Sequence, residues 1–357
     1  MTIRVEKTQH PKEKPVDHNQ LGFGDIFTDH MFLMNYKEGQ GWYDPRIVPY
    51  GPLSLDPAAM ILHYAQEVFE GMKAYCGEDG VVRLFRPQEN FKRLNSSNEH
   101  VCIPPVDEEL LLDALKQLII LDKDWIPTAP NTSLYIRPFI IATDAHLGVR
   151  PSHEYLLAII LSPVGVYYKE GLNPVKIYVE TKYVRAVRGG LGMCKTSGNY
   201  AASLKAQVVA NDQNYTQVLW LDGVERKYIE EVGTMNVFFK LGDEIVTPEL
   251  RGSILPGITR KSAIELLRHW GYKVSERLIS IEEVAQAAKN GELVEAFGTG
   301  TAAVISPIGH LKWGDEIMEI NSGAIGPVSQ KLYDTLTGIQ WGRQRDPFGW
   351  MVEVCEK

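Results

Sequence analysis

The sequence has few cysteines, no excess of positive charge and no long uninterrupted apolar run. Only four of its 357 residues are cysteine, and they have neither metal-site nor C-x-x-C spacing. We therefore expect a reducing compartment, no disulfide framework and no metal site. The apolar runs are shorter than the ~18 residues that a membrane-spanning helix needs. The first twenty residues lack the apolar core of a signal peptide. These absences predict a cytoplasmic protein.

Acidic residues outnumber basic ones. The 45 Asp and Glu against 37 Lys and Arg give a formal net charge of −8. A surface for nucleic acid or for an anionic membrane needs clustered Lys and Arg, so we predict neither as a partner. Apolar residues make up 44% and charged residues 23% of the chain, which is typical of a globular protein. At ~100–200 residues per domain, the length predicts two domains.

Residue patterns predict mixed secondary structure on both sides of a linker. We interpret residues 62–72 as a helix with Tyr64, Val68 and Phe69 on one side. An Asp-Gly turn between two β-prone runs predicts a hairpin over residues 72–85. Further expected elements are helices from Pro87 and over 107–121, 199–212 and 259–271, and strands over 132–143, 154–164, 175–184, 217–223, 235–242, 273–279 and 293–297.

Residues 164–174 contain two glycines between apolar strands, and we interpret them as the interdomain linker. The elements do not alternate regularly between strand and helix, which disfavours a doubly wound sheet. We therefore predict an α+β fold with one sheet-containing domain on each side of the linker. Residues 1–163 would form a small N-terminal domain with an irregular arm, and residues 175–357 a larger C-terminal domain.

Common nucleotide and hydrolase motifs are missing. Cys194 stands where a P-loop needs the glycine before Lys195, and the chain has no G-x-S-x-G or H-E-x-x-H motif. Lys195 instead follows three glycines and precedes another, so backbone can approach a ligand closely. A lysine in such a site can lose its proton by desolvation and form a Schiff base with a carbonyl. Taken alone, a solvated surface lysine is the simpler alternative.

Three other segments could bind parts of one cofactor. Residues 256–260 begin a helix whose free N–H groups and threonine could bind phosphate. Residues 298–301 follow an apolar strand, and their amides could form an anion nest. Glu231 could hold a protonated ring nitrogen, unless it is a solvated acid like its neighbour Glu230. Together with Lys195, these groups match the phosphate, pyridine nitrogen and aldehyde of pyridoxal 5′-phosphate.

At these residues the sequence resembles the branched-chain amino acid aminotransferases, which are pyridoxal-phosphate enzymes of fold type IV. The resemblance implies two sheet-containing domains, with the Schiff-base lysine in the C-terminal one. It implies ping-pong transamination of leucine, isoleucine or valine with 2-oxoglutarate, giving branched 2-oxo acids and L-glutamate. It runs from about Phe23 to about Trp350 and is carried by the segments FGDIFTDHM, LHYAQEVFEGMKAY, RLFRPQENFKRL, TSLYIRP, KTSGNY, EVGTMN, ILPGITR and FGTGTAAVISP.

The resemblance also implies roles for individual residues. Lys195 would form the Schiff base and move the α-proton, Glu231 would pair with the pyridine nitrogen, and Tyr200 would bind the phenolic oxygen of the ring. The implied phosphate residues are Arg93, Ile258, Thr259 and Thr301.

The implied substrate site combines polar and apolar residues. Tyr135, with the backbone of Thr301 and Ala302, would bind the α-carboxylate. Arg137 alternates with Tyr135 along a predicted strand, so both share a face, and it would bind the distal carboxylate of glutamate. The residues implied to line the apolar pocket are Phe27, Tyr64 and Phe69. For Phe69, core packing is an equally good interpretation.

The resemblance implies a homodimer in which the loop His146–Val149 reaches the neighbouring site. Two alternatives remain open from the sequence. One is another fold-type IV enzyme, such as a D-amino-acid aminotransferase or an aminodeoxychorismate lyase, although the segment LHYAQEVFEGMK favours the branched-chain enzyme. The other is a binding protein without catalysis, which the joint presence of Lys195, Tyr200 and Glu231 disfavours. Residues 303–306 lack the C-x-x-C of some relatives, so no thiol switch is implied there.

Overall fold

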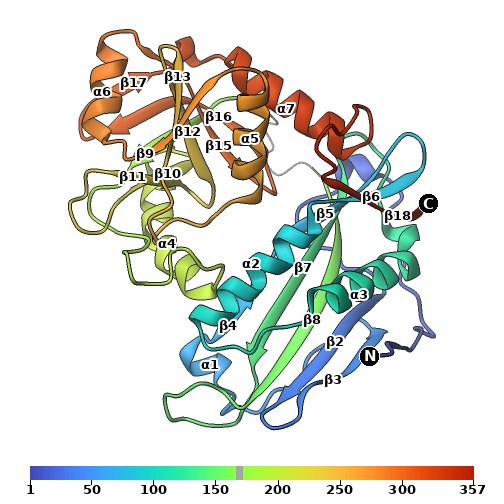
Figure 1. Ribbon diagram of the computed structural model, residues 1–357. Helices are drawn as coiled ribbons and strands as arrows, with labels where there is room; N and C mark the ends of the chain where they lie inside the picture. Colours follow the sequence, from blue (N-terminus) through green and yellow to red (C-terminus); the bar gives the residue numbers. More distant parts are fainter. Residues whose placement is uncertain (166–171) are drawn as a thin grey trace. The chain divides into compact units, whose positions relative to one another are not determined.

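The computed structural model describes residues 1–165 and 172–357, and the chain divides into two compact units (Figure 1). The first unit contains the described residues up to 165, together with 194–197 and 338–357, and the second contains 172–193 and 198–337. Each unit is built on a nine-stranded sheet with helices. This architecture confirms the predicted α+β fold class.

The limits predicted for the two domains stay a prediction, because residues 166–171 of the linker 164–174 lie outside the described residues. Two segments that the sequence placed in the C-terminal domain belong by their contacts to the first unit. One is residues 194–197, which include Lys195. The other is the C-terminal end of the chain, whose last strand pairs with a strand of the first sheet.

The first unit holds a mostly antiparallel sheet. Its strands are β1 (Arg4–Val5), β2 (His30–Lys37), β3 (Gly41–Pro49), β4 (Glu67–Phe69), β5 (Met72–Cys76), β6 (Val81–Phe85), β7 (Ser133–Ala142), β8 (Glu154–Val164) and β18 (Met351–Glu356). Its helices are α1 (Ile61–Tyr64), α2 (Pro87–His100) and α3 (Glu108–Leu121), with short 3-10 turns at His18–Gln20 and Lys123–Trp125. The strand order is β1-β3-β2-β8-β7-β5-β6-β18, and β4 pairs with β7.

The predicted hairpin, the helix from Pro87, the helix over 107–121 and the long strands β7 and β8 are all confirmed. Asp107 caps α3 by accepting hydrogen bonds from two backbone N–H groups of the first turn. Leu111, Leu115 and Leu118 lie on one side of α3 and are fully buried. Burial of each such side chain contributes ~1.5–3 kcal/mol. Apolar periodicity therefore fixes how α3 packs.

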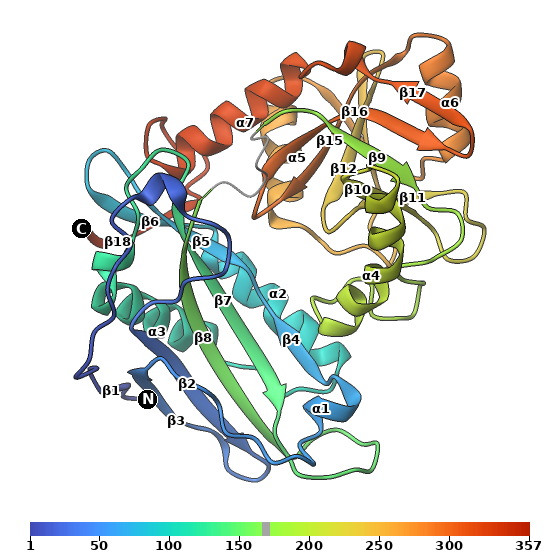
Figure 2. The ribbon, with the colours of Figure 1, turned by 180° about the vertical axis from the view of Figure 1, so that it is seen from behind.

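Alternate residues of β7 face opposite sides of the first sheet. Leu134 and Ile136 are fully buried in the core that includes α3. Tyr135 and Arg137 face the other side, where the ring of Phe23 lies 5.0 Å from that of Tyr135. Figure 2 shows the segment that precedes β2 crossing this face, opposite α2 and α3. The two polar side chains therefore share a face that the helices leave open.

The helix predicted over residues 62–72 is wrong beyond its first turn. Helix α1 ends because Ala65 has φ 51° and ψ 32°, in the left-handed region. Residues Glu67–Phe69 then form β4, which pairs antiparallel with β7. Pairing with a distant strand outweighs the local helical pattern. The two aromatic residues of the segment therefore do not lie on one side of a helix.

The second unit holds a mixed sheet. Its strands are β9 (Val175–Val179), β10 (Gln217–Leu221), β11 (Ile229–Val232), β12 (Asn236–Leu241), β13 (Glu244–Pro248), β14 (Lys273–Arg277), β15 (Leu293–Gly300), β16 (Val304–Trp313) and β17 (Glu316–Glu319). Its helical elements are α4 (Ser197–Asp212), α5 (Ile258–His269), α6 (Ile281–Lys289), the 3-10 turn Asn321–Gly323 and α7 (Pro327–Gln340). The strand order is β11-β10-β9-β16-β15-β12-β13-β14, and β17 pairs with β16. In the described ranges, every helix is too short or too polar to cross a membrane.

Candidate active site

The residues predicted to bind cofactor or substrate fall in both units, and each unit is described by itself. The first unit carries Phe27, Tyr64, Phe69, Arg93, Tyr135, Arg137 and Lys195. The second carries Tyr200, Glu231, Ile258, Thr259, Thr301 and Ala302.

Lys195 is held by its backbone in the first unit. The N–H of Phe69 donates to the carbonyl of Lys195 at 3.0 Å, and the N–H of Lys195 donates to Ser97 Oγ at 3.0 Å. The hydroxyl of Thr196 donates to the Glu67 carbonyl at 2.6 Å. Strand β4 and helix α2 therefore fix this segment on two sides. The lysine is half-buried, unlike a solvated residue of a surface loop.

Arg93 lies on α2 and forms a buried pair with Glu70. Its Nε donates to Glu70 Oε1 at 2.8 Å and its Nη2 to Oε2 at 2.9 Å. Asn90 Nδ2 donates to the same carboxylate at 2.8 Å. Burial opposes ionisation of Glu70, but the charge and hydrogen bonds of Arg93 outweigh it and hold the pKa of Glu70 below its usual range. The predicted phosphate residue of this unit is thus fixed by a bidentate ion pair.

The predicted catalytic residue Lys195 and the predicted substrate residue Arg137 both lie beside the ring of Phe69. Lys195 Nζ lies 4.9 Å from the ring centroid, and the Arg137 guanidinium carbon lies 4.7 Å from it. Arg137 Nη2 donates to the hydroxyl of Tyr135 at 3.0 Å. Phe69 is 9% exposed, so it packs in the core and also contacts both cations.

Phe27 and Tyr64 have other neighbours in the first unit. Phe27 stacks on Tyr50 with ring centroids 5.1 Å apart. The hydroxyl of Tyr64 donates to the carbonyl of Leu147, within the loop His146–Val149. The described contacts therefore tie Tyr64 to the loop predicted to reach a neighbouring subunit.

In the second unit, Glu231 lies in β11 and is 4% exposed. Its Oε1 accepts a hydrogen bond from the Leu255 N–H at 2.8 Å. Its Oε2 lies 3.2 Å from Arg185 Nε. Among the described residues Arg185 Nε has no well-aligned hydrogen bond, so the contact with the carboxylate is electrostatic. Glu231 is therefore a buried, paired carboxylate and not a solvated one.

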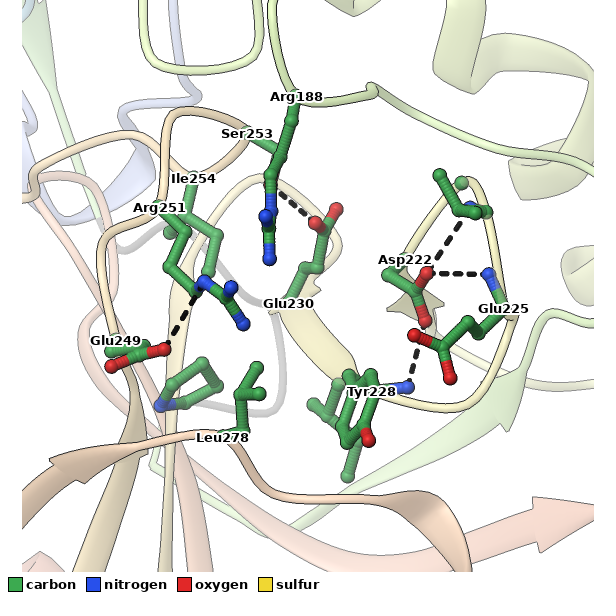
Figure 3. Close-up of a pocket in the computed structure, with 14 residues that line it drawn as sticks. Arg188, Asp222, Glu225, Tyr228, Glu230, Glu249, Arg251, Ser253, Ile254 and Leu278 are labelled. Atoms are coloured by element: carbon green, nitrogen blue, oxygen red, sulfur yellow. Dashed lines mark hydrogen bonds and ion pairs between the residues drawn. The ribbon is translucent and has the colours of Figure 1, made fainter.

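Glu230, the adjacent residue, has different surroundings. Neighbouring residues of a strand point to opposite faces, and Glu230 lines a cavity of about 420 Å³ (Figure 3). The hydroxyl of Ser253 donates to Glu230, as Figure 3 shows beside Arg188. Burial raises the pKa of the Glu230 carboxyl. The two acids, which the sequence could not separate, therefore have different hydrogen-bond partners, although the charge of Arg185 acts on both.

Asn236 joins Glu231's neighbourhood to the turn that carries Thr301 and Ala302. It begins β12, opposite Thr299 of β15. Strand β15 ends at Gly300, which pairs with Val304 at the start of β16, so the turn closes the β15–β16 hairpin. The turn that carries Thr301 and Ala302 was predicted to bind an anion. It therefore lies at the end of the strands where β12 begins.

Asn236 also holds the segment that begins α5. Its Nδ2 donates to the Leu255 carbonyl at 2.9 Å. A Cβ placed on Gly257 would lie 2.0 Å from Asn236 Oδ1, so glycine is needed for this close approach. Gly257 is the N-cap of α5, and within the described chain no side chain caps this helix. The first-turn N–H groups of Ile258 and Thr259 thus lack a side-chain cap.

Tyr200 lies in the first turn of α4 and is half-buried. Its carbonyl accepts a hydrogen bond from the Ser203 hydroxyl at 2.7 Å, which is a contact within the helix. This places the residue without testing the role predicted for its phenol. In the described residues no group of three or more His, Cys, Asp or Glu side chains could hold a metal ion.

Sequence reasoning missed the residues that hold the predicted ones, namely Glu70, Ser97, Arg185 and Asn236. For Glu70 a signal existed, because an acid directly after the apolar pair Val68-Phe69 must find a partner if that segment is buried. For Arg185 the sequence offers no comparable signal. Arg188 lies three residues later in the same loop, and local pattern does not distinguish the two.

Comparisons with known proteins agree with this arrangement. The model of the family "Amino-transferase class IV" matches residues 67–311. "Branched-chain-amino-acid aminotransferase 2" of Bacillus subtilis (strain 168) is 65% identical, covering 99% of this chain and 97% of that protein. The crystal structure of the branched-chain amino acid aminotransferase of Escherichia coli has a TM-score of 0.77 and 27% identity, covering 92% of this chain and 99% of that one.

A second solved structure shows a bound compound. It is the T.th. branched-chain amino acid aminotransferase complexed with N-(5′-phosphopyridoxyl)-L-glutamate. It has a TM-score of 0.72 and 26% identity, and the match covers 90% of this chain and 98% of that one. The family model covers well over half of the chain, and the Bacillus relative covers nearly all of it. The chain belongs to the class IV aminotransferase family.

Proposed function

We propose that this chain is a branched-chain amino acid transaminase that uses pyridoxal 5′-phosphate to exchange the amino group of leucine, isoleucine or valine with 2-oxoglutarate. The observation that carries the proposal is the 65% identity to a branched-chain aminotransferase over 99% of the chain. The other fold-type IV activities and a non-catalytic binder are not favoured by these relatives.

The described residues suit this cofactor in their donor chemistry. Class IV aminotransferases depend on pyridoxal phosphate, and the T.th. relative is complexed with a phosphopyridoxyl compound. Here the uncapped N-terminus of α5 offers N–H groups, and Arg93 offers a fixed guanidinium for a phosphate. Glu231 offers a buried carboxylate for a ring nitrogen, and Lys195 offers an amine for an aldehyde. We propose that these residues, with Tyr200, Thr259 and Thr301, hold the cofactor.

Lys195 is the group that we propose moves the proton. When bound, the cofactor supplies an aldehyde and an electron-withdrawing ring that stabilises negative charge at the substrate α-carbon. The Lys195 amine would accept the α-proton and deliver it to the aldehyde carbon of the cofactor, which is general acid–base catalysis. Its backbone bonds to Phe69 and Ser97 fix the point from which the side chain extends. Glu231 stabilises positive charge on the ring nitrogen.

The polar face of β7 supports a site for two kinds of substrate. Tyr135 and Arg137 are joined by a hydrogen bond, and the guanidinium lies over the ring of Phe69. A guanidinium so placed can bind a carboxylate in bidentate fashion. When an apolar side chain occupies the pocket, the Arg137 guanidinium keeps its contacts with the rings of Phe69 and Tyr135. Arg137 would thus serve glutamate without excluding leucine.

We further propose that the protein is a cytoplasmic homodimer. Leu147 and Val149 are 63% and 86% exposed in the loop that Tyr64 contacts. Two exposed apolar residues on one short loop are typical of a surface that a partner covers. Sedimentation of wild type and of Val149→Asp tests this: a dimer that the substitution weakens is expected, and a monomeric wild type would refute it.

A panel of amino donors with 2-oxoglutarate tests the reaction. L-leucine, L-isoleucine and L-valine are expected to yield glutamate, and D-alanine and aminodeoxychorismate are expected to yield none of their products. A preference for the D-amino acid would replace this proposal with the related fold-type IV activity.

A further inference from the structure

Arg185 is a buried cation that the predicted site did not include. Its side chain is 7% exposed and lies 3.2 Å from Glu231, whose side chain is 5% exposed. Its Nη2 donates to the carbonyls of Gly192, at 3.3 Å, and of Ser253. A buried guanidinium is costly unless it is paired. The pair with Glu231 and the two carbonyls together account for its burial.

The backbone at Gly192, in the loop that carries Arg185, packs closely against Ser253. A Cβ placed on Gly192 would lie 2.2 Å from the Ser253 carbonyl oxygen and 2.6 Å from Ala186 Cβ. The loop that carries Arg185 therefore lies directly against the segment that ends at Leu255. That segment supplies the N–H bonded to Glu231 Oε1. Two neighbouring backbone segments thus hold the carboxylate, one through a hydrogen bond and one through a charge.

We propose that Arg185 is a positioning residue that keeps Glu231 ionised and in place to hold the protonated ring nitrogen of the cofactor. The inference rests on the proposed function, because it concerns the role given there to Glu231. A buried carboxylate without a cation nearby favours its neutral form. A neutral Glu231 could not balance the charge of a protonated ring nitrogen. The positive charge of Arg185 favours the ionised form of Glu231, and the Leu255 N–H orients its carboxylate.

The competing interpretation is that Arg185 only joins two loops. Its bonds to Gly192 and Ser253 would then matter for folding, and Glu231 would be an incidental neighbour. The two interpretations differ in what happens at the ring nitrogen. They also differ in whether loss of Arg185 matters once Glu231 has lost its charge.

The test compares Arg185→Gln with Arg185→Lys and with the matched control Arg188→Gln. Arg188 is exposed in the same loop and lies outside the Glu231 pair. The first measurement is the ¹⁵N chemical shift of ring-labelled pyridoxal 5′-phosphate bound to each variant. We expect a protonated nitrogen in wild type, Arg188→Gln and Arg185→Lys, and loss of that signal in Arg185→Gln. The kcat of Arg185→Gln should fall about ten- to one-hundred-fold, while the cofactor stays bound and KM for leucine changes little.

A double-mutant cycle separates positioning from folding. In a Glu231→Gln background, Arg185→Gln should cause little further loss of kcat, because the charge that it supports is already absent. Equal losses in both backgrounds, or a ring nitrogen that stays protonated in Arg185→Gln, would overturn the inference. If Arg185→Gln melts at a lower temperature, Arg185→Lys decides alone: a protonated nitrogen supports the inference and an unprotonated one overturns it.

Failure of the proposed function gives a different result. Wild-type protein that binds the cofactor but forms no glutamate from leucine and 2-oxoglutarate would refute the proposed reaction, and the ring-nitrogen signal would still decide the role of Arg185. Wild-type protein that binds no cofactor would refute both.

Discussion

A buried pair of a carboxylate and a guanidinium occurs among the described residues of each unit, and these two pairs are built in opposite senses. In the first unit the base, Arg93, is the proposed cofactor residue and the acid Glu70 holds it. In the second unit the acid, Glu231, is the proposed cofactor residue and Arg185 holds it. Glu70 is 0% exposed and forms two aligned bonds with Arg93. Among the contacts described for it, Glu231 accepts a hydrogen bond from a backbone N–H and lies in electrostatic contact with Arg185.

The two pairs differ in the kind of contact that holds the proposed cofactor residue. A bidentate pair sets both distance and plane, so Arg93 has one orientation. Glu231 is held instead by a backbone N–H and by the charge of Arg185. In both pairs, a second buried charged residue stabilises the charge of the proposed cofactor residue.

The largest effect is expected from Lys195→Ala. Without an amine to carry the α-proton, leucine-dependent formation of glutamate should fall by at least about 10²–10⁴-fold, the usual contribution of a positioned acid–base group. The assay is glutamate production at saturating leucine, with Lys205→Ala on the exposed side of α4 as the control. Activity within about tenfold of wild type would remove Lys195 from the mechanism.

Glu70→Gln should break the bidentate pair. It leaves Arg93 buried without its charge partner, and loss of one member of a buried pair costs about 3–5 kcal/mol. Chemical denaturation at neutral pH should show that loss, together with weaker cofactor binding. Glu89→Gln serves as the control and should change little, because Glu89 is a partly exposed acid on α2, the helix that carries Arg93. A stable variant that still binds cofactor would mean that Arg93 does not need this acid.

The pH dependence of the same pair has a defined sign. The pKa of Glu70 is lowered from 4.5 in the folded protein, so its contribution to stability is complete above pH 4.5 and is lost as pH falls through the lower folded value. The difference in unfolding free energy between wild type and Glu70→Gln should therefore shrink in acid below pH 4.5. A difference that stays constant down to the acid unfolding of the protein would contradict this account.

Glu231→Gln should act mainly on rate. The amide keeps the shape but cannot balance a protonated ring nitrogen, and loss of one charged contact is worth ~1.5–3 kcal/mol, or about one to two orders of magnitude in kcat. Glu230→Gln, on the opposite face of the same strand, should leave kcat near wild type. If the two variants exchange these behaviours, Glu230 is the ring partner.

Arg137→Met should have the most selective effect. We expect the glutamate half-reaction to slow by about one to two orders of magnitude, since a charged contact worth ~1.5–3 kcal/mol is lost. The leucine half-reaction should change little. Single-turnover rates with each amino acid, on a variant of normal melting temperature, measure both. An equal fall in the two rates would mean that Arg137 serves the fold and not the distal carboxylate.

Local pattern predicted those elements whose burial follows a regular period. The apolar side of α3, the alternation along β7 and the turn of the β5–β6 hairpin are properties of a few consecutive residues. The segment 62–72 escaped this reasoning because its structure is decided by β7, a strand far along the chain. Several other elements, among them strands β2, β3 and β16 and helices α6 and α7, were not predicted either.

The candidate site shows the same limit. Motifs and resemblance indicated Lys195, Arg93 and Glu231, whose proposed roles depend on residue type. Their partners Glu70 and Arg185 have roles that exist only after folding brings the charges together. A sequence states which groups are ionisable, but the pairing of buried charges depends on long-range contacts that local periodicity does not encode.

The most direct test of the central claim is to locate the cofactor on the chain with and without substrate. The protein is loaded with pyridoxal 5′-phosphate, reduced with borohydride, and digested for mass spectrometry. The account predicts a phosphopyridoxyl label on Lys195, which disappears when L-leucine is added before reduction and returns when 2-oxoglutarate follows. A label on another lysine, or a label on Lys195 that L-leucine does not affect, would contradict it.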